Sequence, residues 1–268
     1  MKQRIMIIDT TIAEKCMKAR ILSDLHMEHA PFLYQYQGED VVFLAGDIHS
    51  ANRTHEILEQ IEIAADIPVF GVIGNHELYD QVFDDVIDYH IAIQNRFPNY
   101  TFLNNSTAEY QGIPIYGGAM FTDFKLYGET DEWFAKQSAK LLISDFRDSC
   151  IRTSLTKQWT TTDHTNQFDL FVAGLKQFLA DYESASTKIV ISHFMPSPQC
   201  IHPNYTMSTI NGYFAANMES YMGWNGYWFA GHGHNSVSTS VHDTKIIINP
   251  KGYHDQNKQF NPNLIIEI

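Results

Sequence analysis

Cysteine is scarce in this sequence of 268 residues, and long apolar runs are missing from it. The three cysteines, Cys16, Cys150 and Cys200, are scattered and form no CxxC pair. This excludes a disulfide-rich scaffold and favours free thiols in a reducing compartment, so we expect a cytoplasmic protein. No apolar run is long enough to cross a bilayer, and the N-terminus shows no basic segment followed by an apolar stretch, so we expect neither a membrane span nor a signal peptide.

Positive charge is also in short supply. Lys and Arg total 18 against 31 Asp and Glu, which gives a formal net charge of −13. Because nonspecific binding to nucleic acid or to an anionic membrane needs basic patches, we expect neither long nucleic acid nor a membrane as a partner. Part of the acid can be local, since a site for divalent cations needs carboxylates.

Repeats, low-complexity tracts and linkers are absent from the sequence, and 44% of its residues are hydrophobic, which is ample for a sizeable core. We therefore predict a single domain over residues 17–268. Residues 1–16 form a possible N-terminal extension, because Met17 comes shortly before the first strand that leads into a polar motif. An ordinary extra strand over residues 5–8 is the alternative.

Apolar runs alternate with a helical pattern in the first part of the chain. Strands are expected over residues 19–23, 41–45 and 69–73, with a helix over 52–65 between the last two. This alternation is typical of an α/β domain with a parallel sheet. Further along the chain, the patterns predict helices within 79–96 and over 130–143 and 166–183, and strands over 101–103, 113–116, 188–192, 227–230, 237–241, 244–248 and 264–268.

Potential metal ligands follow five of these strands. The motifs are Asp24-Leu25-His26, Gly46-Asp47, Gly74-Asn75-His76-Glu77, His193 and Gly231-His232-Gly233-His234. The carboxyl ends of strands in an open α/β sheet form the ligand site. Carboxylate and imidazole ligands together suit Mn, Fe or Zn. The groups exceed what one ion needs, which favours two ions about 3.5–4 Å apart with one bridging carboxylate.

The last motif leaves one geometric question open. Alternate residues of an extended chain point to opposite sides, so His232 and His234 reach one small region only if the loop bends or if they bind through different nitrogens.

Taken in this order, the five motifs resemble those of the calcineurin-like metallophosphoesterases, and within that superfamily the bacterial predicted phosphohydrolase branch. The match runs from about Ala19 to Ile248, with supporting stretches at 122–124, 196–198 and 249–253. The resemblance implies an α/β fold, a four-layer α/β/β/α sandwich of two mixed sheets flanked by helices.

The resemblance also implies roles for single residues. The first metal would be held by Asp24, His26 and His234, and Asp47 would bridge. The second metal would be completed by Asn75, His193 and His232. His76 would face the substrate rather than a metal.

Two departures narrow the expected substrates. In the protein-phosphatase branch an Asp-Arg-Gly sequence continues the second motif, and its arginine binds phosphate, whereas Asp47 is followed here by Ile48-His49-Ser50. This argues against a Ser/Thr phosphoprotein phosphatase. The cyclic-nucleotide branch usually has an aspartate where Ser50 stands, so that assignment is weakened too.

We therefore expect a dinuclear metal-dependent phosphohydrolase that cleaves a phosphodiester or phosphomonoester by a metal-bridging hydroxide attacking in line. Asp47 and His76 would be catalytic, His76 as acid or positive contact for the leaving oxygen. Glu77 would orient a neighbouring histidine. The alternatives are a non-catalytic interaction module on the same fold and a metal-storage or sensing site.

A small or nucleotide-like phosphorylated substrate is expected, because Lys and Arg are sparse around every motif. Residues that could line the mouth of the site are His29, His49, Tyr79, Asp123, His202 and Tyr213. An aromatic part of the substrate could stack on Tyr79, Phe194 or Tyr213.

Overall fold

The computed structural model describes residues 16–268 except 51, 148, 149 and 255. The strand considered for residues 5–8 lies outside the described residues. Among the helices that are described, none combines the length and the apolar composition that a membrane crossing requires.

Two mixed sheets form the centre of the molecule. The first has the order β14-β1-β2-β3-β5, with β1 at Lys18–Leu22, β2 at Val41–Ala45, β3 at Val69–Val72, β5 at Tyr100–Phe102 and β14 at Ile265–Glu267. The second has the order β12-β13-β11-β10-β7-β6, with β12 at Val237–Val241, β13 at Thr244–Ile248, β11 at Gly226–Ala230, β10 at Lys188–Ile191, β7 at Ile113–Gly117 and β6 at Ser106–Tyr110. In each sheet four neighbouring strands are parallel, and antiparallel strands lie only at the edges.

The two sheets pack face to face through aromatic and branched side chains. Phe43 of β2 and Phe229 of β11 are buried with their ring centroids 5.1 Å apart, and Phe70 of β3 stacks on Phe43 at 5.8 Å. Every residue of β2 and of β11 is buried. Strands covered on both faces have continuous apolar sequences, which explains why these runs were readily predicted.

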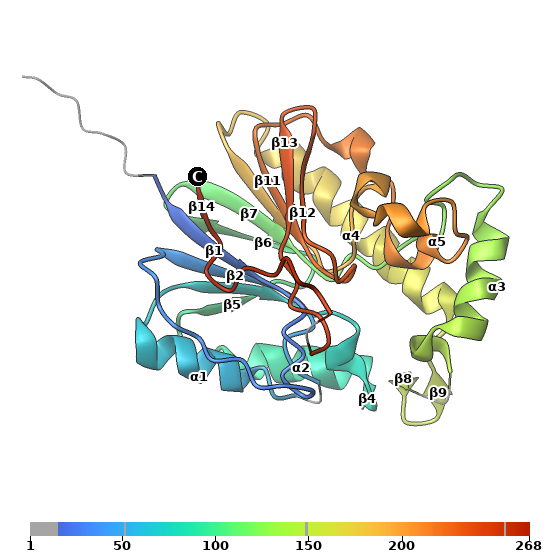
Figure 1. Ribbon diagram of the computed structural model, residues 1–268, viewed down its shortest axis with the longest axis horizontal. Helices are drawn as coiled ribbons and strands as arrows, with labels where there is room; N and C mark the ends of the chain where they lie inside the picture. Colours follow the sequence, from blue (N-terminus) through green and yellow to red (C-terminus); the bar gives the residue numbers. More distant parts are fainter. Residues whose placement is uncertain (1–15, 51, 148–149, 255) are drawn as a thin grey trace, which may run out of the picture.

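Helices cover the outer faces of both sheets. Figure 1 shows α1 (His55–Ala64) and α2 (Phe83–Ile93) along the outer side of the first sheet. The long helix α4 (Thr161–Asp181) covers the second sheet, where Phe171 contacts Tyr116 at 5.1 Å and Trp228 at 6.3 Å between ring centroids. The expected four-layer α/β/β/α sandwich is confirmed.

Helix α4 begins five residues earlier than its apolar pattern predicted. The side chain of Thr160 accepts the Asp163 backbone N–H at 3.2 Å, and the Asp163 carboxylate accepts the Thr160 N–H at 2.9 Å. This capping box satisfies two backbone donors and extends the helix over a polar first turn. The helices expected over 52–65, 79–96 and 130–143 are each shorter, the last being α3 (Glu132–Leu142).

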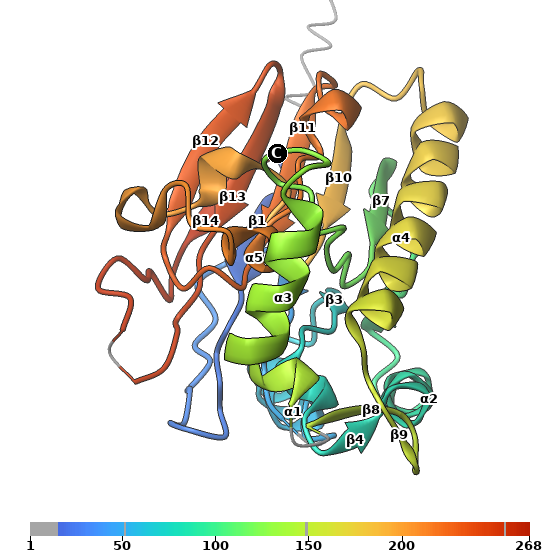
Figure 2. The ribbon, with the colours of Figure 1, turned by 90° about the vertical axis from the view of Figure 1, so that its right-hand side faces the viewer.

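Several short elements lie outside the predicted pattern. They are a small sheet of β4 (Gln81–Val82), β8 (Ile151–Ser154) and β9 (Lys157–Gln158), the short helix α5 (Asn211–Phe214), and single 3-10 turns such as Ser144–Phe146. Figures 1 and 2 both draw α3 beside α5. A Cβ on Gly212 would lie 3.0 Å from the Ala135 Cβ, so glycine permits this close packing.

The N-terminal boundary can be tested through Met17. Met17 is buried, and it exchanges two backbone hydrogen bonds with Ile268, at 3.0 and 2.9 Å. A chain that begins at Met17 is expected to unfold at the temperature of the full chain. A chain that begins at Arg20 should lose about 2–5 kcal/mol, because it loses a buried side chain and the end of a sheet strand.

The midpoint temperature of thermal unfolding is compared for the full chain, the chain from Met17 and the chain from Arg20. If the chain from Met17 unfolds early or fails to bind metal, residues 1–16 contribute to the fold and the proposed boundary is wrong.

Candidate metal centre

The five sequence motifs come together where parallel strands of the two sheets end. Asp24 and His26 follow β1, Asp47 follows β2, Asn75 and His76 follow β3, His193 follows β10, and His232 and His234 follow β11. Three compact groups of possible ligand atoms lie there among the described residues. The first is formed by Asp24, His26 and His234 and the second by Asp47, His193 and His232, while the third shares His26 with the first and adds Glu28 and His76. The first two bring together histidines and aspartates that were expected to hold two ions, with Asn75 beside the second.

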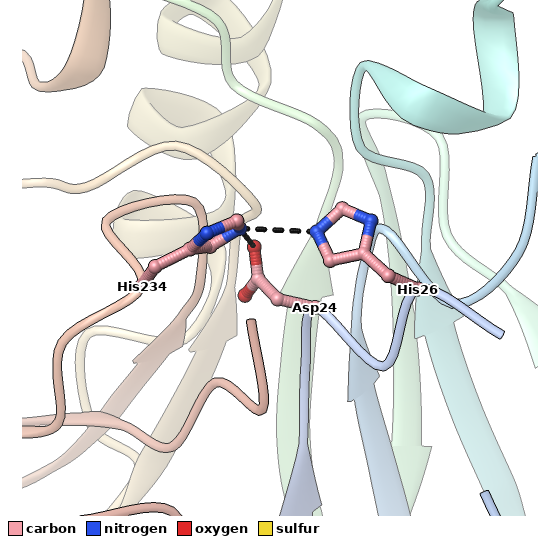
Figure 3. A group of neighbouring side chains, drawn as sticks. All are labelled: Asp24, His26 and His234. Carbon is pink, nitrogen blue, oxygen red and sulfur yellow. Dashed lines mark hydrogen bonds and ion pairs between the residues drawn. The ribbon is translucent and has the colours of Figure 1, made fainter. Parts of the chain in front are cut away.

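In the first group, two imidazole nitrogens and a carboxylate oxygen converge (Figure 3). The Nε2 atoms of His26 and His234 are 3.0 Å apart, and the His234 Nε2 is 3.3 Å from Asp24 Oδ1. Nitrogen ligands lie about 2.0–2.1 Å from zinc, so two of them at a right angle are about 3 Å apart. The spacing therefore fits a single cation.

The outer nitrogens of this group are held by acceptors. His26 Nδ1 donates to Glu28 Oε1 at 3.0 Å, and His234 Nδ1 donates to Gln256 Oε1 at 2.8 Å. An N–H on Nδ1 leaves the lone pair on Nε2, which is the form of histidine that ligates a metal.

In the second group, three buried atoms lack a hydrogen-bond partner within the described part of the chain. They are Asn75 Oδ1, His193 Nε2 and His232 Nε2. An unsatisfied buried polar atom costs about 1–3 kcal/mol. The His193 Nδ1 donates to the Ala45 carbonyl at 2.8 Å, so Nε2 is the ring nitrogen that is available to a metal once it is deprotonated. Ligand atoms of His193, His232 and Asp47 all lie within 4.8 Å of one another, so these residues fit a metal.

Asp47 lies between the two groups. Its Oδ2 is 3.3 Å from His193 Nε2 and 3.8 Å from His26 Nε2, while its Oδ1 accepts the His76 backbone N–H at 2.8 Å. One carboxylate oxygen thus faces both groups, as a bridging ligand requires.

The chain bends sharply at the candidate ligands, which answers the question about the last motif. His232 has a φ of 69° and His234 a φ of 47°, so the two side chains enter different groups. Asp24, His26 and Asp47 also have φ between 44° and 52°. Such left-handed conformations cost about 1–3 kcal/mol for non-glycine residues and are concentrated at functional sites.

Glu77 joins the loops after β2 and β3. Its carboxylate accepts backbone N–H groups from Ile48 at 2.7 Å, Gly74 at 2.8 Å and Asp47 at 3.0 Å. Burial, with a contribution from the nearby Asp47 charge, raises the pKa of Glu77 to about 7. The orientation of a histidine that was expected of Glu77 is instead performed by Glu28.

Glu28 and Tyr253 hold the ring of His76. The His76 Nδ1 is 3.1 Å from Glu28 Oε1, and its Nε2 is 2.7 Å from the Tyr253 hydroxyl. Burial alone would raise the pKa of Glu28, but hydrogen bonds from His26 and His76 outweigh it and hold that pKa well below its usual range. Burial opposes protonation of His76, yet the Asp47 and Glu28 charges raise its pKa.

Neither of these partners was identified from the sequence. Glu28 carried a usable signal, because it continues the alternation of Asp24 and His26 by one more step. Tyr253 belongs to the stretch 249–253 that supports the family resemblance, but the sequence assigned no role to it.

Asp145 is a third residue that the sequence did not reveal. It is fully buried in the 3-10 turn after α3, where Oδ1 accepts from the Tyr79 hydroxyl at 2.9 Å and from Asn75 Nδ2 at 3.2 Å. Its Oδ2 accepts from the Tyr213 hydroxyl at 2.6 Å. Because Asp145 accepts an N–H from the Asn75 side chain, it fixes the orientation of that amide.

The expected mouth residues divide into two sets. Tyr79, His202 and Tyr213 line a cavity of about 430 Å³ beside both groups, together with Asp47 and His76. His29, His49 and Asp123 are not among its lining residues. Phe194 is 0% exposed, so the expected stacking of a ligand on this ring is wrong.

Removal of the Asp145 carboxylate should weaken the second metal site selectively. In Asp145→Ala the Asn75 amide loses the acceptor that orients it, so we expect about 10–100-fold weaker binding of the second ion with the first retained. Tyr213→Phe, which keeps Asp145, should have a smaller effect. Metal content and binding isotherms measure both.

Asp243→Ala in the exposed β12–β13 turn is the matched control. Equal loss of both ions in Asp145→Ala, or no loss at all in a folded variant, would contradict the orienting role.

Comparison with known proteins finds chains of similar sequence and fold. An uncharacterized protein of Acanthamoeba polyphaga mimivirus is 23% identical over an alignment that is 282 positions long. The alignment covers 93% of this chain and 96% of that protein. The phosphopantetheinyl hydrolase of Mycobacterium tuberculosis superposes with a TM-score of 0.70 at 17% identity, covering 94% of this chain and 96% of the other. A structure described as a putative 5′-nucleotidase of Staphylococcus aureus superposes with a TM-score of 0.50 at 14% identity. The superposition covers 89% of this chain and 49% of the other.

At these identities the solved structures establish the fold and no more. The family model for calcineurin-like phosphoesterases, however, matches residues 17–236, which is most of the chain and includes all five motifs. The expected superfamily and the expected hydrolase activity on phosphoric esters are confirmed: this chain belongs to the metal-dependent calcineurin-like phosphoesterase family.

Proposed function

We propose that this protein is a dinuclear metal-dependent phosphohydrolase that cleaves a phosphodiester or phosphomonoester of a small or nucleotide-like substrate in the cytoplasm. The position of Asp47 Oδ2 between two ligand groups is the observation that supports two ions rather than one. Mn, Fe or Zn suits the mixed donors. The first ion would be held by Asp24, His26 and His234, the second by Asn75, His193 and His232, with Asp47 shared.

Bound cations supply charge neutralisation of the phosphoryl oxygens and a water of lowered pKa. The chain itself supplies the acid. His76 lines the cavity, holds one ring nitrogen against Glu28, and directs Nε2 toward Tyr253. A proton on that nitrogen would be the one transferred to the leaving oxygen of an ester bound in the cavity within hydrogen-bond reach.

Small substrates are favoured over phosphoproteins and long nucleic acid. The chain has a net charge of −13, so a polyanion is repelled away from the metals. The arginine that follows the bridging aspartate in protein phosphatases is absent from the sequence after Asp47. The motifs are complete, which favours turnover over a scaffold or a storage site.

A metal-reconstituted screen tests the proposal. It compares phosphomonoesters, phosphodiesters, cyclic nucleotides, dinucleoside polyphosphates, a phosphopeptide and single-stranded DNA at physiological salt. A phosphopantetheinyl ester is included because one fold neighbour bears that name. Preference for the phosphopeptide or the DNA, or no hydrolysis by protein that binds two ions, would contradict the proposal.

Loss of the shared carboxylate should cost more activity than loss of the acid. Asp47→Asn disturbs both ions, whereas His76→Ala removes a proton donor worth roughly 10²–10⁴-fold. Steady-state kinetics on an ester with a poor leaving group compares the two variants. The role assigned to His76 is refuted if His76→Ala turns over this ester at the unchanged rate.

Metal binding should release protons and weaken as the pH falls. Burial opposes protonation of His193, but the Asp47 and Asp24 charges outweigh it and raise the pKa to about 10 in the metal-free protein. Below that pH a cation must displace the proton from Nε2, so apparent affinity should decrease with decreasing pH.

Calorimetry in buffers of different ionisation enthalpy counts the released protons, and His193→Gln should release about one fewer. An unchanged count in this variant would show that His193 is neutral before the metal binds.

A further inference from the structure

The cavity beside the ligand groups has two unlike parts. One end is formed by the motif residues, including Asp47, Asn75 and His76. Most of the rest is formed by the end of α3 with the turn after it, by the segment between β10 and α5, and by α5 itself. Its apolar and aromatic lining includes Leu142, Ile143, Ile201, Tyr205, Ile210 and Phe214.

Permanent positive charge is missing from this second part, and its lining histidine, His202, accepts the Asn204 backbone N–H on Nδ1 at 3.2 Å. No lysine or arginine lies among the described residues that line the cavity. A second phosphate or a carboxylate held there would be an unpaired anion in a strongly acidic protein, which is costly to desolvate.

The amide side chains of the lining are already engaged within the protein. Asn211 donates to the Tyr127 hydroxyl at 2.9 Å and to the Tyr205 carbonyl at 2.6 Å. Asn235 donates one of its side-chain N–H groups to the Cys200 carbonyl at 3.3 Å. Asn211 therefore has no side-chain N–H left for an anion, and Asn235 has only one.

We propose that the cavity selects phosphoesters whose organic group is uncharged and apolar or aromatic, with a single phosphoryl group at the metals. This inference rests on the proposed function and narrows it. A volume of about 430 Å³ is within the range of small-molecule sites and accommodates an organic group of modest size. Nucleoside diphosphates and dinucleoside polyphosphates are disfavoured because each carries further anionic charge.

Paired substrates that differ only at their far end test the selection. The 4-nitrophenyl diesters of hexyl phosphate and of 5-carboxypentyl phosphate share one leaving group, and the hexyl and 5-carboxypentyl monoesters provide a second pair. We expect kcat/KM to favour the uncharged member by about tenfold or more, the usual scale for a difference within one pocket. Calorimetry with hexylphosphonate and 5-carboxypentylphosphonate measures binding without turnover.

A lysine placed in the lining should reverse the preference. Ile210→Lys is the main variant and Ile143→Lys the second, in case one of them does not fold. Ile63→Lys is the matched control, because Ile63 is 86% exposed on α1, on the outer side of the first sheet. It should keep the preference of the unmodified protein.

The outcomes separate the two proposals. The unmodified protein could hydrolyse and bind the hexyl and 5-carboxypentyl compounds equally well, or prefer the 5-carboxypentyl compounds. Either result overturns the cavity inference and leaves the proposed function standing. If the metal-loaded protein hydrolyses no ester and binds neither phosphonate, the proposed function fails and the inference fails with it. The inference is supported if the protein prefers the uncharged hexyl compounds and if this preference reverses in either cavity lysine variant but not in Ile63→Lys.

Discussion

The buried carboxylate of Glu77 fixes the relative position of two strand ends on which the whole site depends. It accepts backbone N–H groups from the loop after β2 and from the loop after β3. This places Asp47 so that one oxygen accepts from the His76 backbone and the other lies between two groups of histidines. No side chain fits at Gly74, because a Cβ there would lie only 2.1 Å from Asp47 Oδ1. The site is therefore preorganised by backbone contacts, which suits precise placement of a reacting group.

This arrangement accumulates interactions that are unfavourable in the metal-free chain. Asp24, Asp47, Glu77 and Asp145 are all buried, and several candidate ligands have left-handed backbone conformations. Buried charges and strained residues destabilise a fold unless something compensates them. Histidines and backbone donors compensate part of the cost, and bound cations would compensate more. The concentration of these features at one edge of two sheets marks it as a place selected for chemistry rather than for stability.

Two parts of the fold divide the work of the site. The strand ends of the central sheets supply the candidate ligands and His76. The turn after α3 and the segment leading to α5 supply the apolar wall of the cavity. Asp145 connects the two parts, because it belongs to that turn and yet binds Asn75 and the Tyr79 and Tyr213 hydroxyls. A shift of the turn after α3 would therefore move Asp145 and, through it, the Asn75 side chain beside the second ligand group.

The sequence by itself determined most strands of the two central sheets, the long helices that cover them and the set of candidate ligands. Fully buried strands such as β2 and β11 are continuous apolar runs, and each ends in a motif whose order along the chain is distinctive. Helix ends were less certain, as at Thr160, because capping depends on a local hydrogen bond that leaves no apolar pattern. The family resemblance assigned His232 and His234 to different metals, but only the tertiary structure shows how the loop directs them to different groups, through backbone bends at both residues. Only the tertiary structure brought Glu28, Asp145 and Tyr253 into the site and buried Phe194 against His232, with 4.2 Å between the ring centroids. These contacts join residues that lie up to 177 positions apart and depend on how the layers and loops pack, which no local pattern encodes.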